Sequence, residues 1–81
     1  MESRIATVTM IVTNTESAQR INQLLHEYGS YIVGRMGLPY KEKKLSVILF
    51  VIDAPTDVIG ALTGKLGMID DVTVKTMYAK C

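Results

Sequence analysis

Four stretches of the chain alternate apolar and polar or β-branched positions, and two stretches between them repeat with helical spacing. The alternating stretches are residues 4–13, 31–36, 45–52 and 70–79. A period of two with many β-branched residues predicts strands. The apolar positions with helical spacing are Ala18, Ile21, Leu24, Leu25 and Tyr28 in the first stretch and Val58, Ile59, Leu62 and Leu66 in the second. These stripes predict amphipathic helices, and the order along the chain is β-α-β-β-α-β.

The first helix has signals at both ends. Thr13 with Glu16 fits a capping box, and Asn14 or Thr15 could cap the helix instead. Gly29 is placed to end the helix with a left-handed residue.

The second half of the chain contains turn signals and several glycines. Residues 37–40 and the charged residues after them are expected to connect the second and third strands. Pro55 suits the first turn of the second helix, because a missing N–H costs nothing there. Gly60, Gly64 and Gly67 weaken that helix, so we expect it to be short or closely packed on the sheet.

This order of elements predicts an α+β, ferredoxin-like fold. Right-handed crossovers favour a four-stranded antiparallel sheet with both helices on one face and the first and third strands in the centre. The 81 residues suffice for a single domain, residues 1–81. A domain of this size is marginally stable alone and gains from self-association.

The third strand predicts an apolar sheet face without helices. Both alternating sets of residues 45–52 are apolar, so one set must point away from the helices. Because Ser46 shares their register, we assign Ile48, Phe50 and Ile52 to the helix-free face, together with Ile5 and Ile11. Burying five such side chains contributes about 8–15 kcal/mol before the cost of association. We therefore expect a homo-oligomer, dimer or tetramer; scattered surface hydrophobics are the alternative.

Charge and composition argue against nucleic-acid binding and against membrane insertion. Nine basic and eight acidic residues give a net charge of +1, whereas phosphate-binding proteins cluster their basic residues. The one basic cluster, Lys41, Lys43 and Lys44, suits a solvated hairpin turn.

The longest apolar run, residues 47–52, is too short to cross a bilayer. No signal peptide is apparent, and the single cysteine, Cys81, indicates a reducing compartment, so we expect a cytoplasmic protein.

Few residues offer catalytic or metal chemistry. His26 is the only histidine, and no serine or cysteine lies in a recognisable nucleophile turn. We therefore predict no enzyme, no catalytic residue, no cofactor and no metal site. A metal site shared between protomers, with His26 repeated by symmetry, is the alternative.

The segment Gly34-Arg35-Met36-Gly37 has two interpretations. The glycines would let a small ligand or a partner strand approach the backbone, and Arg35 could hold a carboxylate or phosphate. Alternatively, they mark a bulge and a strand end, with Arg35 solvated.

Several runs resemble a known family. LLHEYG (24–29), IVGRMGLPY (32–40), IGALTGKLG (59–67) and VTVK (72–75) are similar to a small bacterial family of iron-only hydrogenase system regulators. The resemblance implies an ACT-like domain, similar to the C-terminal domain of nickel-responsive repressors. Such domains oligomerise and bind small effectors, commonly amino acids, or metal.

The chain departs from both groups of relatives. It lacks the histidine and cysteine set of the nickel site, and residues 14–17 lack the Asp-x-x-Gly or Pro-Gly pattern of many amino-acid-binding ACT domains. We predict an oligomeric, effector-binding regulatory module, which the resemblance links to transcription and to iron-only hydrogenase or metal metabolism. It would act through another protein or as an effector-sensing partner. The candidate effector-binding residues are Asn14, Thr15, Gly34, Arg35 and Gly37. A purely structural interaction domain is the alternative.

Overall fold

The computed structural model describes residues 2–80, so Met1 and Cys81 lie outside the described part of the chain. The elements are β1 (Arg4–Val12), α1 (Ser17–Glu27), the 3-10 helix η1 (Gly29–Tyr31), β2 (Ile32–Tyr40), the 3-10 helix η2 (Lys41–Lys43), β3 (Leu45–Ala54), α2 (Thr56–Gly67) and β4 (Val72–Tyr78). No helix of the described chain is both long and apolar enough to span a membrane.

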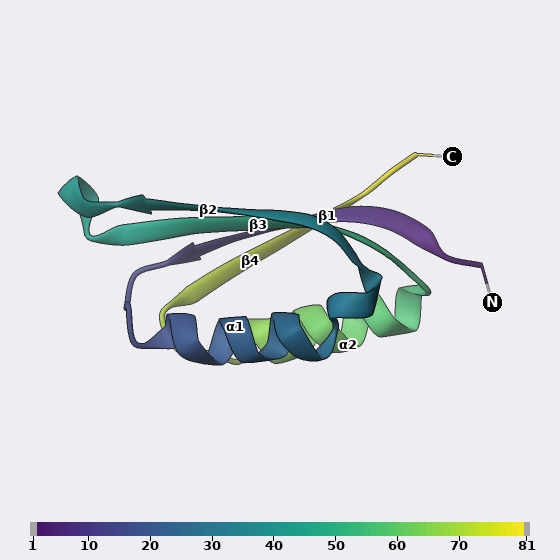
Figure 1. Cartoon of the computed structure of the whole chain (residues 1–81), viewed down its shortest axis with the longest axis horizontal. Helices are drawn as coiled ribbons and strands as arrows, with labels where there is room; N and C mark the ends of the chain where they lie inside the picture. Colours follow the sequence, from purple (N-terminus) through teal and green to yellow (C-terminus); the bar gives the residue numbers. More distant parts are fainter. Residues whose placement is uncertain (1, 81) are drawn as a thin grey trace.

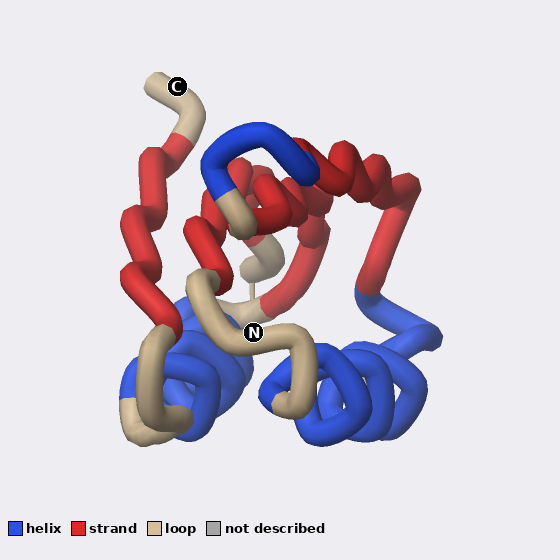
Figure 2. The backbone as a smooth tube through the Cα atoms, turned by 90° about the vertical axis from the view of Figure 1, so that its left-hand side faces the viewer, coloured by secondary structure: helices blue, strands red, loops and turns tan. Residues whose placement is uncertain are grey.

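The strands form one antiparallel sheet in the order β2-β3-β1-β4. Both helices lie side by side on the same side of this sheet (Figures 1 and 2). The β2–β3 hairpin extends past the helices to η2 (Figure 1). The predicted α+β, ferredoxin-like fold with β1 and β3 in the centre is confirmed.

The core lies between the sheet and the two helices. Every second residue of β1 from Ala6 to Val12 is buried, and the apolar stripes of both helices pack against them. The other buried apolar residues are Ile21, Leu24, Leu25, Ile48, Phe50, Ile52, Ala54, Ile59, Leu62 and Leu66. This one cluster accounts for the predicted helical stripes.

The assignment of Ile48, Phe50 and Ile52 to the helix-free face is wrong. Phe50 and Ile52 are 0% exposed and Ile48 is 8% exposed. They pair directly with Met10, Val8 and Ala6 of β1, and residues opposite each other in an antiparallel pair point to the same face. Because the β1 set faces the helices, the β3 set must face them too.

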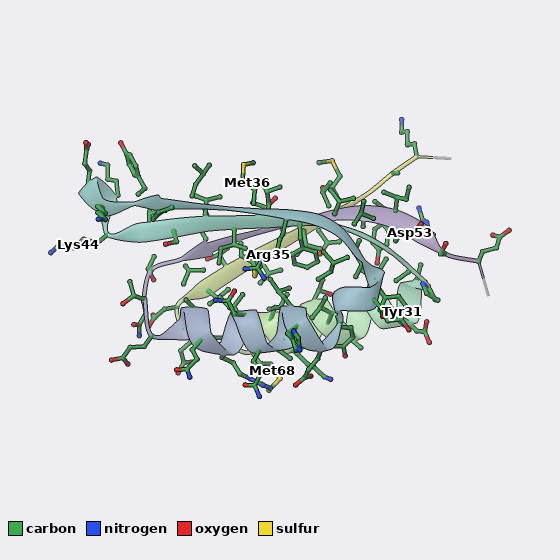
Figure 3. All side chains as sticks on the ribbon, in the orientation of Figure 1. Tyr31, Arg35, Met36, Lys44, Asp53 and Met68 are labelled. Carbon is green, nitrogen blue, oxygen red and sulfur yellow. The ribbon has the colours of Figure 1, made fainter. Side chains whose placement is uncertain are left out.

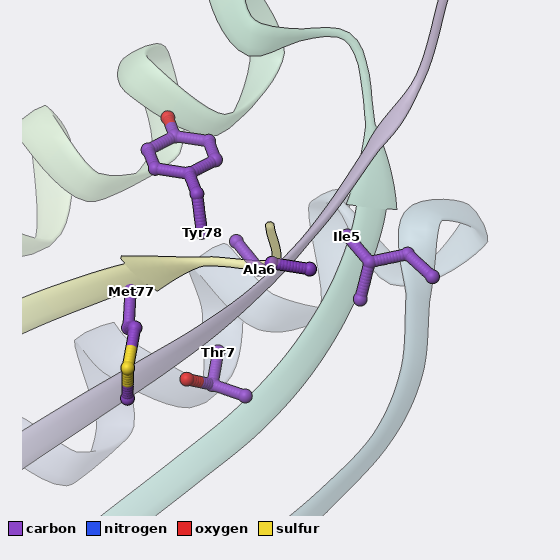
Figure 4. A pocket seen from close by; sticks show the side chains of 6 residues that line it. Ile5, Ala6, Thr7, Met77 and Tyr78 are labelled. Carbon is purple, nitrogen blue, oxygen red and sulfur yellow. The ribbon is translucent and has the colours of Figure 1, made fainter. Parts of the chain in front are cut away.

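The helix-free face, which we call the outer sheet face, is formed by the other register of each strand. Its residues are Ile5, Thr7, Thr9 and Ile11 of β1, Met36, Leu38 and Tyr40 of β2, Leu45, Val47, Leu49, Val51 and Asp53 of β3, and Thr73, Lys75 and Met77 of β4. Ile5 and Ile11 lie there as predicted and are 50% and 42% exposed. Met36 points away from the helices (Figure 3). Thr7 and Met77 are paired, and Met77 leaves β4 on the side opposite to Tyr78 (Figure 4).

The ends of α1 differ in part from the prediction. The Asn14 side-chain oxygen accepts a hydrogen bond from the Glu16 N–H at 3.0 Å. Glu16 occupies the N-cap position of α1, and its own side chain makes no capping hydrogen bond. Gly29 is not left-handed, since no described glycine has a positive φ. Tyr28 ends α1 with φ −100° and ψ 15°, and the chain continues directly into η1.

The segment between the second and third strands also differs. Residues 37–40 belong to β2 rather than to a connection, and they pair with residues 45–48 of β3. The turn is η2 with Lys44 in the left-handed region at φ 54°. A bulge lies between Ile32 and Gly34.

The second helix is longer than its glycines suggest. It has 12 residues, and Pro55 precedes its first residue instead of lying inside the first turn. Gly60 and Gly64 are exposed, with no atom within 4 Å of where a Cβ would be. The helix therefore packs through its leucines and isoleucine, not through glycine contacts with the sheet.

Candidate functional site

Three adjoining hollows lie along the inner side of β2, next to α1. The middle hollow, of about 240 Å³, shares Asn22 and Arg35 with a hollow of about 520 Å³ that reaches Gly29 of η1. It shares Thr15, Pro39 and Ser46 with a third hollow, of about 500 Å³, that reaches Lys41 of η2. We call these three hollows together the β2–α1 groove.

The small residues of β2 explain why the groove is open. Gly37 pairs with Ile48, whose side chain faces the helices, so position 37 faces the helices as well. No atom lies within 4 Å of where a Cβ of Gly37 would be. Because β2 is an edge strand, no further strand closes the groove from the side. Ser46 lines the groove, and this is why a polar residue fits the core-facing register of β3.

Arg35 is the central charged group of the groove. It pairs with Phe50 and points from β2 toward α1 (Figure 3). Its Nη2 donates a hydrogen bond to Oδ1 of Asn22 at 2.6 Å. Asn22 is neutral, so this bond orients the guanidinium and leaves its charge uncompensated. A guanidinium has five N–H donors. In the described part of the chain Arg35 makes only the bond to Asn22, so its other donors are free to bind a ligand.

The charged residues that line the groove are all basic. Arg35, Lys41 and Lys44 line it, His26 lies at one end, and none of its lining residues is Asp or Glu. The whole chain, by contrast, has nearly equal numbers of acidic and basic residues, eight and nine. The groove is therefore a local concentration of positive charge on a nearly neutral protein.

The five predicted effector-binding residues all line this groove, at different places. Thr15, Arg35 and Gly37 share the middle hollow. Asn14 lies in the hollow toward η2 and Gly34 in the hollow toward η1. Their part in binding stays a prediction.

Asn14 also has structural contacts. Besides accepting the Glu16 N–H bond, its Nδ2 donates to Oδ2 of Asp71 at 3.4 Å. Thr13 N–H donates to the Asp71 carbonyl at 3.0 Å, and Ser17 Oγ donates to the Asp70 carbonyl at 2.9 Å. These bonds attach the β1–α1 loop to the turn before β4 and fix one wall of the groove.

The sequence did not identify Asn22 and Pro39 as groove residues. Asn22 lies four residues after Ala18 and four before His26, so helical spacing places the three on one side of α1. The missing information was that this side faces β2. Pro39 was expected in a connection, and its position became clear only from the length of β2.

Other features of the surface offer less chemistry. A small apolar hollow of about 170 Å³ lies at the end of the β1–β4 pairing, beside Ile5, Ala6 and Tyr78 (Figure 4). A hydrogen bond of 2.9 Å from Lys65 Nζ to the Tyr28 hydroxyl raises the pKa of Lys65 above its ordinary value. Lys65 therefore stays charged at neutral pH. Among residues 2–80, no three His, Cys, Asp or Glu side chains are grouped closely enough to hold a metal ion.

Comparison with known proteins gives one family and two informative structures. Residues 4–76 match the model of the TM1266-like family, described as "Iron-only hydrogenase system regulator, putative". The structure of the uncharacterized protein TM1266 from Thermotoga maritima is 38% identical, with a TM-score of 0.93, over 98% of this chain and 100% of that chain. The divalent ion tolerance protein CutA1 from Ehrlichia chaffeensis shares the fold at 17% identity, with a TM-score of 0.54, over 100% of this chain and 86% of that chain. No curated protein matches the sequence.

Proposed function

We propose that this chain, which belongs to the TM1266-like family of iron-only hydrogenase system regulators, is an oligomeric regulatory module of the cytoplasm that binds a small effector. The family match confirms the resemblance seen in the sequence. The family is described as a regulator and not as an enzyme. Charge and composition argue against direct nucleic-acid binding, so the module would act on transcription through a partner protein.

The position of Arg35 is the observation that carries the effector proposal. Ligand sites are concave, mostly apolar, and contain a few polar groups that point to one place. The middle hollow has an apolar floor that includes Val12 and Ile48, with the Arg35–Asn22 pair at its side. Thr15 adds a hydroxyl group from the β1–α1 loop. This arrangement supports binding of a small molecule between β2 and α1.

The outer sheet face supports self-association. Met36, Leu38 and Met77 are 49%, 54% and 70% exposed in the single chain. Two of the positions that define the face are charged, Lys75 and Asp53, and Asp53 lies near the end of β3. Interfaces within oligomers are apolar and poor in charge at their centre. An apolar patch on one face can pair with the same patch of a second copy around a two-fold axis. We therefore propose that a second copy of the chain covers this face.

A change of Gly37 to valine tests effector binding. The new side chain would occupy open space in the groove, and the backbone there needs no positive φ. In a thermal-shift screen of amino acids, organic acids and metal salts, we expect at least one compound to stabilise the wild type. A ligand at 100 times its Kd adds about 2.7 kcal/mol of stability, and Gly37→Val should lose this gain.

Gly60→Val is the matched control for this experiment. Gly60 is exposed on α2 and also has no atom within 4 Å of a Cβ position, but it does not line the groove. Its ligand response should equal that of the wild type. If no compound stabilises the wild type, the effector proposal is wrong.

A purely structural interaction domain is the second candidate. It is favoured by the outer sheet face, which needs a partner but no ligand. In that case Gly37→Val would leave assembly and partner binding unchanged, and the glycines would serve only the shape of β2.

A further inference from the structure

We infer that the β2–α1 groove binds a small aliphatic carboxylate, with the Arg35 guanidinium holding the carboxylate group. This inference rests on the effector role proposed above and names the chemical class of the effector. It differs from an amino-acid effector, because an amino acid brings an ammonium group that also needs a partner.

The charge of the lining selects the sign of the ligand. Arg35, Lys41 and Lys44 line the groove, and no lining residue is acidic. Among the lining residues a cationic ligand would meet only like charges and no carboxylate, and the Asp71 carboxylate behind the wall is hydrogen-bonded to Asn14. An ammonium group would find only neutral oxygens, such as those of Asn22 and Thr15. The lining therefore favours an anion and disfavours a diamine, a metal cation or a zwitterion.

The geometry of Arg35 selects the anionic group. Planar guanidinium groups match carboxylates in paired, bidentate hydrogen bonds. The bond of 2.6 Å to Asn22 uses one nitrogen, Nη2, and holds the side chain against α1. The other N–H groups can then point at a ligand without further ordering of the side chain. Asn22 is thus a positioning residue, and Arg35 is the binding residue.

The apolar floor of the middle hollow favours a ligand with a hydrocarbon chain. Apolar atoms of Val12, Ala18 and Ile48 line it, and the place opposite Ile48 on β2 is the empty position of Gly37. A hydrocarbon chain would bury its surface there, whereas an inorganic anion would leave the floor wet. The hollow has a volume of about 240 Å³ and is open at its side. This space suits a short aliphatic acid.

Four probes of matched size or charge test the class of ligand. Glutarate carries two carboxylates on a five-carbon chain, and glutamate adds an ammonium group. The compound 1,5-diaminopentane has the same number of carbons with an ammonium group at each end, and inorganic phosphate has no hydrocarbon. Each is titrated into the wild-type chain labelled with ¹⁵N, and the side-chain signals of Arg35 and Asn22 are followed. We expect glutarate to bind at least tenfold more tightly than each of the other three. Tighter binding of glutamate or of the diamine would overturn the inference.

Variants of the Arg35–Asn22 pair show whether the site is the predicted one. Arg35→Gln removes the charge and should weaken glutarate binding at least tenfold. Asn22→Asp keeps the shape but places a carboxylate beside Arg35 that competes with the ligand, so it should also lose binding. Arg20→Gln removes an exposed arginine of α1 that is hydrogen-bonded to Gln23 and does not line the groove, and it should bind like the wild type.

The outcomes separate this inference from the effector proposal. Equal glutarate binding by the wild type and Arg35→Gln, or no glutarate binding at all, would overturn the carboxylate assignment. If another compound still stabilises the wild type and loses its effect in Gly37→Val, the effector role survives this failure. If nothing binds, both proposals fall.

Discussion

At the scale of single residues, Asn14 shows how one side chain connects several segments. Its Oδ1 accepts a hydrogen bond from the Glu16 N–H just before α1, and its Nδ2 donates to the Asp71 carboxylate, although Asp71 is 57 positions away in sequence. We expect Asn14→Ala to lower the free energy of unfolding by about 1–2 kcal/mol, because two side-chain hydrogen bonds are lost. Urea denaturation followed by circular dichroism measures this.

The neighbouring Thr15 provides the control for Asn14. Thr15 is exposed and lines the groove, but no hydrogen bond of its side chain is found in the described structure. Thr15→Ala should change stability by no more than about 0.5 kcal/mol. Equal effects of the two changes on the free energy of unfolding would show that the hydrogen bonds of Asn14 do not stabilise the fold by this amount.

The sequence predicted these local contacts only in part. Asn14 was one of the expected caps, and its short side chain does accept a backbone N–H two residues later, but that N–H belongs to Glu16, before the first residue of α1. Gly29 was misread, because the chain does not reverse after α1 but tightens into η1 before entering β2. That choice depends on where β2 joins the sheet, and helix-end residues do not encode it.

At the scale of elements, β3 is the strand whose two faces most needed the structure. Both registers are apolar, so hydrophobicity could not decide which one faces the helices. The pairing with β1 decides it: β1 has the buried Ala6, Val8, Met10 and Val12 on one side, and Thr7 and Thr9 between two exposed isoleucines on the other. Ser46 pointed to the wrong register because the polar site that it occupies is the groove, which was not visible in the sequence.

Two substitutions, one on each face of β3, test which face packs against the helices. Phe50→Ala should lower the free energy of unfolding by about 3–5 kcal/mol, because it leaves a cavity in the core. This approaches the whole stability of an 81-residue chain, about 4–12 kcal/mol. Leu49→Asp should keep the fold but place a charge in the proposed contact between two copies. Urea denaturation and analytical ultracentrifugation at the same protein concentration measure the two effects.

The control for this pair is a new charge outside the outer sheet face. Gln19 is exposed on α1, and both helices lie on the opposite side of the sheet (Figure 2). Gln19→Asp should fold and associate like the wild type. If Leu49→Asp associates as well as Gln19→Asp does, the outer sheet face is not the interface.

At the scale of the whole molecule, the order of elements was enough to predict the fold and the central strands. Right-handed crossovers and two amphipathic helices leave few other arrangements for β-α-β-β-α-β. The groove could be predicted only as separate residues in two segments. Thr15 follows β1 and Arg35 lies on β2, and their meeting depends on how far the edge strand extends beside α1.

Successive residues of β2 face alternately the groove and the outer sheet face, so the same strand takes part in both surfaces. Arg35 and Gly37 line the groove, while Met36 and Leu38, between and beside them, point to the outer sheet face. A ligand in the groove contacts β2 and α1 together and restricts the edge strand, which contains two glycines and a bulge. A second copy that packs on Met36 and Leu38 needs the same ordering. Once one binding event has restricted the strand, the other loses less conformational entropy.

We therefore expect a ligand of the groove to strengthen association of the chain. Coupling of this kind is typically 5–150-fold, and it is reciprocal, so the associated form must bind the ligand more tightly by the same factor. Sedimentation equilibrium with and without the stabilising compound measures the first effect, and ligand titration at low and high protein concentration measures the second. Gly37→Val should associate without responding to the compound, and Leu49→Asp should bind the compound without associating. Equal association constants with and without ligand in the wild type would mean that the two faces of β2 act independently, and the module would then need another route to pass on the signal.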